Sequence, residues 1–245
     1  MRPAAFFDLD RTLISRATPL ALAGSFHRRG LVRRRDLFRA ALWQLVFLIR
    51  GVGEREMRRA AEDGMLLLRG VPVADVEDLL AEAMERVLRP LIYRASLNLV
   101  REHRGRGEPV YVVSASLQQI VERVADDLGL DGAIGSTCEI ENGVFTGRSL
   151  RPCYGALKAD AIREIAARED IDLGRSTAYS DSHTDLAFLE AVGHPTVVNP
   201  DSRLRRLAVE RRWPVLQFAE TLVPERAPRP FRFFRGSRFA GHGSR

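Results

Sequence analysis

The feature of the sequence that most constrains the fold is the alternation of strand-like and helix-like patterns along its second half. The segment PVYVVSAS, from Pro109, has the apolar, β-branched character of a strand, and LQQIVERVADDLG, from Leu117, has helical periodicity. Strand and helix patterns then follow one another to Phe218. A hairpin is expected around Asn142-Gly143, because this pair suits a tight turn. The alternation predicts a parallel, doubly wound (Rossmann-like) α/β sheet.

One further strand pattern, PAAFFDL at residues 3–9, stands far from the others. The chain between it and the second strand carries helical periodicity without strand-like alternation, so we interpret this block as an all-helical cap inserted into the α/β core. The predicted domains are a core of residues 1–15 and 106–223, a cap of residues 16–105, and a flexible, Arg- and Phe-rich tail of residues 224–245.

Composition narrows the class of protein. The N-terminal segment becomes acidic too early for a secretory signal, and the longest apolar stretch, residues 40–49, is about half the length that spans a bilayer. Cys138 and Cys153 form no CxxC pair, so neither a zinc site nor a disulfide framework is predicted. We therefore expect a cytoplasmic protein without a transmembrane segment.

Polar residues stand at the predicted ends of several strands. Asp8 and Asp10 follow the first strand, Ser114 follows YVV, and Asp181 follows TAYS, with Asp185 four residues further on. Ligands of open α/β sheets bind beyond the carboxyl ends of the strands, so these side chains are expected to converge. Converging carboxylates repel one another and need a cation to stay ionised. Mg²⁺ is the expected cofactor, because it prefers oxygen ligands and leaves room for water and phosphate.

Four segments of the sequence resemble, in their order along the chain, the four motifs of the haloacid dehalogenase (HAD) superfamily in its phosphoserine phosphatase-like branch. The segment FFDLDRTLI resembles the DxDxT motif, YVVSAS the strand that ends in Ser or Thr, Lys158 the basic third motif, and YSDSHTDLAFL the terminal acidic motif. The resemblance extends over residues 5–217. The helical insert between the first two motifs matches the position of the cap in that branch.

The resemblance implies a Mg²⁺-dependent phosphomonoester hydrolase that works through an aspartyl-phosphate. In that reading Asp8 is the nucleophile, and Asp10 protonates the leaving oxygen and later activates water. Mg²⁺ would be bound by Asp8, the Asp10 carbonyl and Asp181, with Asp185 as a ligand or as an orienting group. The implied phosphate-binding groups are the side chains of Thr12, Ser114 and Lys158 and the backbone N–H of Ala115.

Lys158 is the single lysine among 38 basic residues. A lysine carries a compact ammonium, whereas the broad fork of an arginine would crowd a site that also holds Mg²⁺ and phosphate. The alternative is a solvated lysine at the start of a helix. The coincidence of Lys158 with the third motif favours a role in the site.

The substrate is less constrained. No Asp or Glu occurs between Asp10 and Asp36, where phosphoserine phosphatases of the family carry an acidic residue for the substrate amine. Arginines at positions 16, 28, 29 and 33–35 stand there instead, either as an inlet for an anionic substrate or as a solvated helix face. The apolar segment 41–49 is either buried packing or a wall for a greasy leaving group. A small phosphorylated metabolite or a lipid-like phosphomonoester is expected.

The tail repeats arginine every third residue from position 226 to 238, among phenylalanines. Such a segment suits a peripheral contact with an anionic membrane, which we favour over nucleic acid, or it is a solvated tail. Two other functions stay open: phosphoserine phosphatase proper, and a phosphotransferase or phosphomutase with the same Asp pair. A silent binding protein is disfavoured, because it has no need for four converging acids. A phosphoacceptor receiver module is disfavoured, because receivers carry no helical insert and no DxD spacing.

Overall fold

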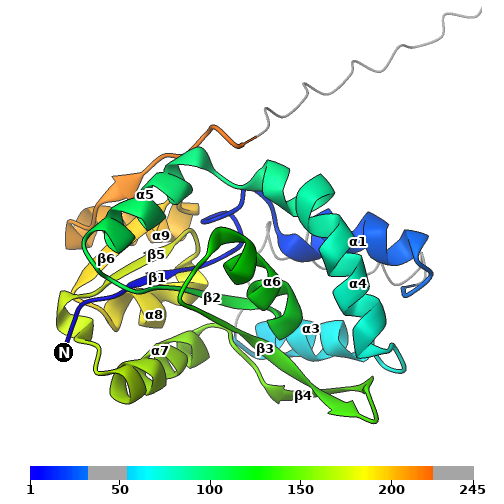
Figure 1. Ribbon diagram of the computed structural model, residues 1–245. Helices are drawn as coiled ribbons and strands as arrows, with labels where there is room; N and C mark the ends of the chain where they lie inside the picture. The colour runs from blue at the N-terminus through cyan, green and yellow to red at the C-terminus, as the bar shows by residue number, and fades with distance from the viewer. Residues whose placement is uncertain (33–53, 223–245) are drawn as a thin grey trace, which may run out of the picture.

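The computed structural model describes residues 1–32 and 54–222 and contains a seven-stranded sheet in the order β4-β3-β2-β1-β5-β6-β7 (Figure 1). All neighbouring strands are parallel except β3 and β4, which form an antiparallel hairpin. The strands are β1 (Ala5–Phe7), β2 (Val110–Leu117), β3 (Gly132–Glu141), β4 (Val144–Arg151), β5 (Thr177–Ser180), β6 (His194–Val198) and β7 (Val215–Leu216). The predicted doubly wound α/β sheet is confirmed.

The central strand is β1, although it comes first in the sequence. It pairs with β2 on one side and with β5 on the other, so that Phe6 lies between Tyr111 and Ala178. The chain therefore builds the sheet outward from β1 in one direction and then returns to its other side. In open α/β sheets, the reversal point leaves a crevice beyond the strand ends. The ends of β1 and β5 border that crevice here.

Successive residues of the central strands point to opposite faces of the sheet, and each face has its own hydrophobic cluster. Phe7 and Tyr179 pack on the face covered by α5 and α6, whereas Phe6 and Ala178 pack on the face covered by α7, α8 and α9. The helices of the core are α5 (Arg94–Gly105), α6 (Gln118–Leu128), α7 (Ala156–Glu169), α8 (Leu186–Glu190) and α9 (Ser202–Arg211), with short 3₁₀ turns η3 (Leu173–Arg175) and η4 (His183–Asp185). Both faces of the sheet are covered, as the apolar strands require.

The described part of the insert between β1 and β2 is helical. It consists of α1 (Thr18–Arg28), α3 (Glu54–Leu66), α4 (Val73–Ala83), the π-helical turn η1 (Met84–Leu88) and the 3₁₀ turn η2 (Arg89–Leu91), before α5. Figure 1 shows α1, α3 and α4 gathered on one side of the sheet. The apolar segment 41–49, the arginines at 33–35 and the tail 224–245 lie outside the described residues. Across the described ranges, no helix combines the length and apolarity that a membrane crossing needs.

The insert shares a hydrophobic cluster with the sheet. Leu22 of α1 and Leu80 of α4 belong to the same cluster as Val121 of α6 and Phe7 of β1. Helix α5 also packs on the sheet, where His103 Nε2 and the Tyr179 hydroxyl are joined by a 2.8 Å hydrogen bond. These contacts associate α5 with the sheet. The predicted boundary between cap and core at residue 105 stays a prediction.

Two turns follow directly from their residues. In the predicted hairpin, Asn142 and Gly143 both have positive φ (51° and 77°), as the tight turn between β3 and β4 requires. Between α8 and β6 the chain passes directly over η3, where the Gly193 N–H donates to the Leu173 carbonyl at 2.9 Å. A Cβ atom at residue 193 would overlap the backbone carbonyl of Gly174. Only glycine permits this approach.

We expect Gly193→Ala to lower the free energy of unfolding by more than about 2 kcal/mol, because two backbone segments must separate. The matched control is Gly64→Ala in the exposed part of α3, where a Cβ atom meets nothing within 4 Å. That variant should gain about 0.5–1 kcal/mol from helix propensity. Urea denaturation measures both values, and equal stability of the two variants would contradict the close-approach argument.

Candidate active site

A buried lysine joins three segments at the crevice. Lys158 Nζ donates hydrogen bonds to Asp8 Oδ1 at 2.5 Å and to Asp185 Oδ2 at 2.7 Å. The three side chains are almost fully buried. The Ser180 hydroxyl also donates to Asp185 Oδ2 at 2.7 Å, which orients this carboxylate from the end of β5. The predicted convergence of Asp8, Lys158 and Asp185 is therefore seen in the structure.

The backbone before α7 aims the lysine at the crevice. Gly155 has φ 54° and ψ −129°, a region that residues with a Cβ atom rarely enter, and it stands immediately before the helix. Lys158 lies in the first turn of α7, and its backbone N–H donates to the Gly155 carbonyl at 3.2 Å. The helix thus begins at the crevice and places the ammonium inside it.

Asp10 is held by the first residue of α1. The backbone N–H and the hydroxyl of Thr18 both donate to Asp10 Oδ1, at 2.8 and 2.9 Å. Since the Thr18 hydroxyl gives its proton to Asp10, it accepts the 2.5 Å hydrogen bond from the Ser116 hydroxyl. Ser116 also lies 3.5 Å from Asp10 Oδ2, which is the less constrained oxygen. The second aspartate of the DxD motif is thereby oriented from α1 and β2 together.

Asp181 follows β5 and faces a second cation. Its Oδ2 lies 2.8 Å from Arg11 Nε, and its side chain is buried. Arg11 has a left-handed backbone (φ 60°), which turns the chain so that the N–H groups of Leu13 and Ile14 both donate to the Leu9 carbonyl. This tight turn keeps the DxDxT segment close to the ends of β1 and β5.

Thr12 has a buried hydroxyl oxygen without a hydrogen-bond partner among the described residues. Its backbone carbonyl accepts a 2.7 Å hydrogen bond from Ser96 of α5, which anchors the turn. Ser114 Oγ accepts from the N–H of Ser116 at 3.1 Å, and the Ala115 carbonyl accepts from the Ser136 hydroxyl at 2.9 Å. Strand β2 continues past Ser114 to Leu117, and its register with β3 shifts in this stretch.

Two other polar residues near the strand ends have structural partners. The backbone N–H and Nδ1 of His183 both lie 2.8 Å from Asp201 Oδ2. Asn199 bonds to Tyr93 and, through both ends of its amide, to the backbone of Phe218. These contacts tie loops together at the rim of the sheet.

Burial dominates the electrostatics of the carboxylates. It raises the pKa of Asp8 to about 7, with the Lys158 ammonium opposing and Asp185 adding to the rise. Burial also raises the pKa of Asp10, which the Thr18 hydrogen bonds partly offset. It raises the pKa of Asp181 well above its usual value, although Arg11 opposes this. For Lys158, burial disfavours the ammonium, but Asp185 and Asp8 outweigh it and raise the pKa.

The charges of the site fit a divalent cation. The four acids Asp8, Asp10, Asp181 and Asp185 face two cations, Lys158 and Arg11, so two negative charges lack a counter-charge when all four are ionised. Among residues 1–32 and 54–222 no three His, Cys, Asp or Glu side chains form a ready metal cluster.

Side chains of the described residues already engage each of the four carboxylates at one oxygen. The Asp185 carboxylate is engaged by Lys158 and Ser180, and the Asp10 carboxylate is engaged by Thr18. Asp8 and Asp181 are each engaged at one oxygen as well, by Lys158 and Arg11. Their second carboxylate oxygens could serve Mg²⁺, which uses few carboxylates and keeps several waters.

Sequence reasoning missed several residues of this constellation. Ser116 could have been found, because it is two residues from Ser114 and so on the same face of β2. Thr18 begins a helix with Pro19 at its first turn, which marks a helix start but not a contact with Asp10. Ser180, Ser96 and Arg11 carry no local signal.

Known proteins resemble this chain over most of its length. A sequence profile of haloacid dehalogenase-like hydrolases matches residues 5–190. A Streptomyces azureus protein named for inhibition of morphological differentiation is 42% identical over 218 residues, covering 89% of this chain and 79% of that protein. A probable phosphatase of Mycobacterium tuberculosis is 40% identical over 230 residues, covering 94% and 80%. The Mycobacterium tuberculosis phosphoserine phosphatase SerB1 is 32% identical over 217 residues, covering 88% and 70%.

The fold of this chain is similar to that of several solved structures. A Bordetella pertussis protein of unknown function has a TM-score of 0.78 at 27% identity and covers 88% of this chain and 98% of its own. A substrate-bound phosphoserine phosphatase has a TM-score of 0.64 at 20% identity, covering 88% of this chain and 93% of its own, which is a likeness of fold alone.

We predict that the metal-free protein loses stability as pH rises from about 4 to 7. Because the folded state holds the Asp8 proton up to about pH 7, it binds more protons than the unfolded state across this window. The slope from this group is at most about 1.4 kcal/mol per pH unit. Asp8→Asn should flatten it and be more stable than wild type at pH 8.

The control for this measurement is Asp126→Asn, which changes an exposed carboxylate on α6. Urea denaturation in a chelating buffer from pH 4.5 to 8 measures all three proteins. An Asp8→Asn curve parallel to that of wild type would show that Asp8 does not keep its proton in the folded state.

Proposed function

The chain belongs to the haloacid dehalogenase-like hydrolase family, and from this premise we propose that it is a Mg²⁺-dependent phosphomonoesterase that works through an aspartyl-phosphate. The observation that carries the proposal is the buried Asp8–Lys158–Asp185 contact beside Asp10 and Asp181. The relatives named as phosphatases support the same reaction class.

In the first step, a carboxylate oxygen of Asp8 attacks the phosphorus atom, and the bond from phosphorus to the leaving oxygen breaks. Lys158 holds Asp8 Oδ1, which fixes the orientation of the carboxylate for an in-line approach. Asp10 gives its proton to the leaving oxygen. Its raised pKa favours the protonated form that a general acid needs, and Thr18 keeps Oδ1 occupied so that Oδ2 can carry the proton.

In the second step, water attacks the phosphorus atom of the aspartyl-phosphate and Asp10 takes the proton of this water. The bond between phosphorus and the Asp8 oxygen breaks, which releases inorganic phosphate and restores both acids. The unpartnered Thr12 hydroxyl supports a phosphate site beside Asp8, because it can donate to a phosphoryl oxygen. Ser114, Ala115 and Lys158 complete the proposed phosphate-binding set.

The proposed Mg²⁺ ligands are the Asp8 and Asp181 carboxylates and the Asp10 carbonyl, with Asp185 in an orienting role. When bound, Mg²⁺ would supply counter-charge to the phosphoryl oxygens. Arg11 now pairs with Asp181 and would have to share or yield this carboxylate.

For the substrate, we propose a phosphomonoester with a leaving group that lacks a free amine. Between Asp10 and the end of α1 the chain carries no acidic side chain that could pair with an ammonium. Phosphoserine phosphatase proper is the second candidate, because a relative of that name matches 88% of this chain. The lipid-like leaving group and the membrane-docking tail depend on residues 41–49 and 224–245, outside the described ranges, and stay predictions.

The decisive assay is phosphate release from a phosphomonoester panel, with and without Mg²⁺. Wild type should require Mg²⁺, and Asp8→Asn should lose at least about 10³-fold in kcat, because the nucleophile is gone. Lys158→Arg should also lose most of the activity, since the guanidinium fork does not fit between two buried carboxylates. A wild-type-like rate for Asp8→Asn would refute the mechanism.

The same panel decides between the two substrates, because phosphoserine with the best kcat/KM would establish the second candidate. Isotope-labelled water separates hydrolysis from phosphotransfer. Label in the released phosphate supports hydrolysis, and its absence together with a phosphorylated acceptor supports a phosphotransferase.

A further prediction concerns Thr18, which we propose positions Asp10. Thr18→Val keeps the shape of the side chain but removes one hydrogen bond to Asp10 Oδ1. We expect kcat to fall about 10- to 100-fold for an alkyl phosphate, whose leaving oxygen needs a proton. For 4-nitrophenyl phosphate, whose leaving group needs no proton, the loss should be several-fold smaller. Equal losses for the two substrates would argue for a purely structural role.

A further inference from the structure

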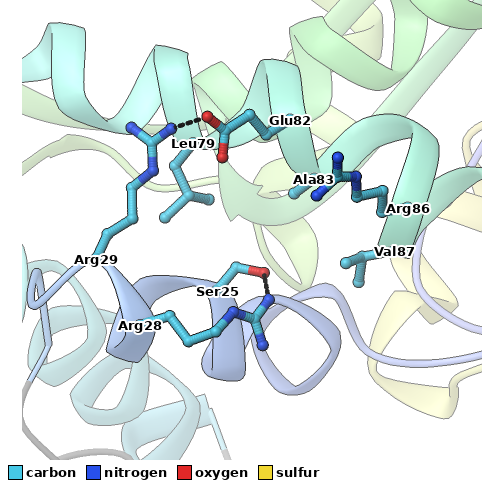
Figure 2. A pocket seen from close by; sticks show the side chains of 8 residues that line it. All are labelled: Ser25, Arg28, Arg29, Leu79, Glu82, Ala83, Arg86 and Val87. Atoms are coloured by element: carbon cyan, nitrogen blue, oxygen red, sulfur yellow. Dashed lines mark hydrogen bonds and ion pairs between the residues drawn. The ribbon is translucent and has the colours of Figure 1, made fainter.

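A pocket lies within the insert, between α1 and the C-terminal part of α4 with η1 (Figure 2). Its volume is about 170 Å³, small beside the pockets that hold drug-sized ligands and adequate for a small anion. It is lined by Ser25, Arg28, Arg29, Leu79, Glu82, Ala83, Arg86 and Val87.

This pocket is separate from the candidate active site. Thr18, at the first residue of α1, contacts Asp10, whereas Arg28 is the last residue of the same helix. At 1.5 Å per residue the two ends are about 15 Å apart. Arg28 and Arg29 therefore lie away from the aspartates, and of the two sequence alternatives the inlet is not supported for these two residues.

The pocket carries more cationic groups than anionic ones. Arg29 forms an ion pair with Glu82, while Arg28 Nη2 donates to the Ser25 hydroxyl at 3.0 Å. Within the described ranges no hydrogen bond or ion pair engages the guanidinium of Arg86. Each guanidinium has five N–H donors, so most donors of Arg28 and Arg86 lack a protein acceptor. The pocket therefore holds two positive charges without a counter-charge.

The donors stand on two sides of the pocket. Figure 2 shows Ser25 and Arg28 on α1 and Arg86 on the opposite helix. A tetrahedral oxyanion can accept hydrogen bonds from both sides at once, whereas the two oxygens of a carboxylate lie in one plane. The pocket lies at the C-terminal turn of α1, where the negative end of the helix dipole opposes an anion. The guanidinium groups must therefore supply all of the attraction.

We propose that this pocket binds a phosphate-type oxyanion, either inorganic phosphate or the phosphoryl group of a small soluble compound, through Arg28, Arg86 and Ser25. Val87, Leu79 and Ala83 give the pocket an apolar wall, which suits a short alkyl group on the phosphate. A bound anion bridges α1 to η1. The proposal does not depend on the catalytic function, because none of these residues contacts the aspartates.

The test follows the arginine Nε–Hε signals of the full chain by NMR while inorganic phosphate is titrated at constant ionic strength. The signals of Arg28 and Arg86, assigned with single substitutions, should shift saturably in the millimolar range. The signal of Arg123, an exposed arginine on α6, should not. In Arg86→Gln the half-saturating concentration for Arg28 should rise at least ten-fold, and in Arg123→Gln it should stay unchanged.

Ethyl phosphate and acetate identify the ligand chemistry. Ethyl phosphate should bind at least as tightly as inorganic phosphate, because of the apolar wall, and acetate should bind several-fold more weakly. Equal responses to acetate and phosphate would overturn the specificity for a tetrahedral oxyanion. Arg28 and Arg86 signals that move no more than Arg123 would overturn the site itself. Phosphate bound at the candidate active site does not affect this reading, because the signals report on the pocket directly.

Discussion

The arrangement of the candidate active site depends on one buried ammonium. Lys158 lies between Asp8 and Asp185, so a single charge connects the end of β1, the start of α7 and η4, across as many as 150 residues of sequence. A buried charge without a partner costs several kcal/mol, but a hydrogen-bonded group of opposite charges offsets much of that cost. The three segments must therefore keep their places together.

The insert is coupled to this centre at two levels. Its helices α1 and α4 share one hydrophobic cluster with α6 and the sheet, so their displacement would expose apolar surface. At the level of single atoms, Thr18 opens α1 and binds Asp10 through both its N–H and its hydroxyl. The helix that begins at the acid therefore ends at the arginine-lined pocket, and its packing influences the geometry of both.

Much of the fold and part of the site could be predicted from the sequence. The alternation of patterns predicted the doubly wound sheet, which is confirmed, and the four ordered motifs predicted the family, which the matching profile confirms. The strand-end argument selected Asp8 and Asp181, because carboxyl ends of parallel strands meet at one edge. That argument could not select Thr18 or Ser180. Their hydroxyls donate to Asp10 and Asp185, and the strand and helix patterns of the sequence do not reveal these partners.

The amino-acid sequence predicts the order of strands and helices, the hairpin at Asn142-Gly143 and the residue types available to a phosphate site, because these depend on local periodicity and motif spacing. The three-dimensional packing sets which oxygen each donor reaches and which arginines lie near the aspartates. Arg11 pairs with Asp181, whereas Arg28 lies a helix length away and lines another pocket. The physical reason is that hydrogen bonds and ion pairs act over about 3 Å, and packing alone sets such distances.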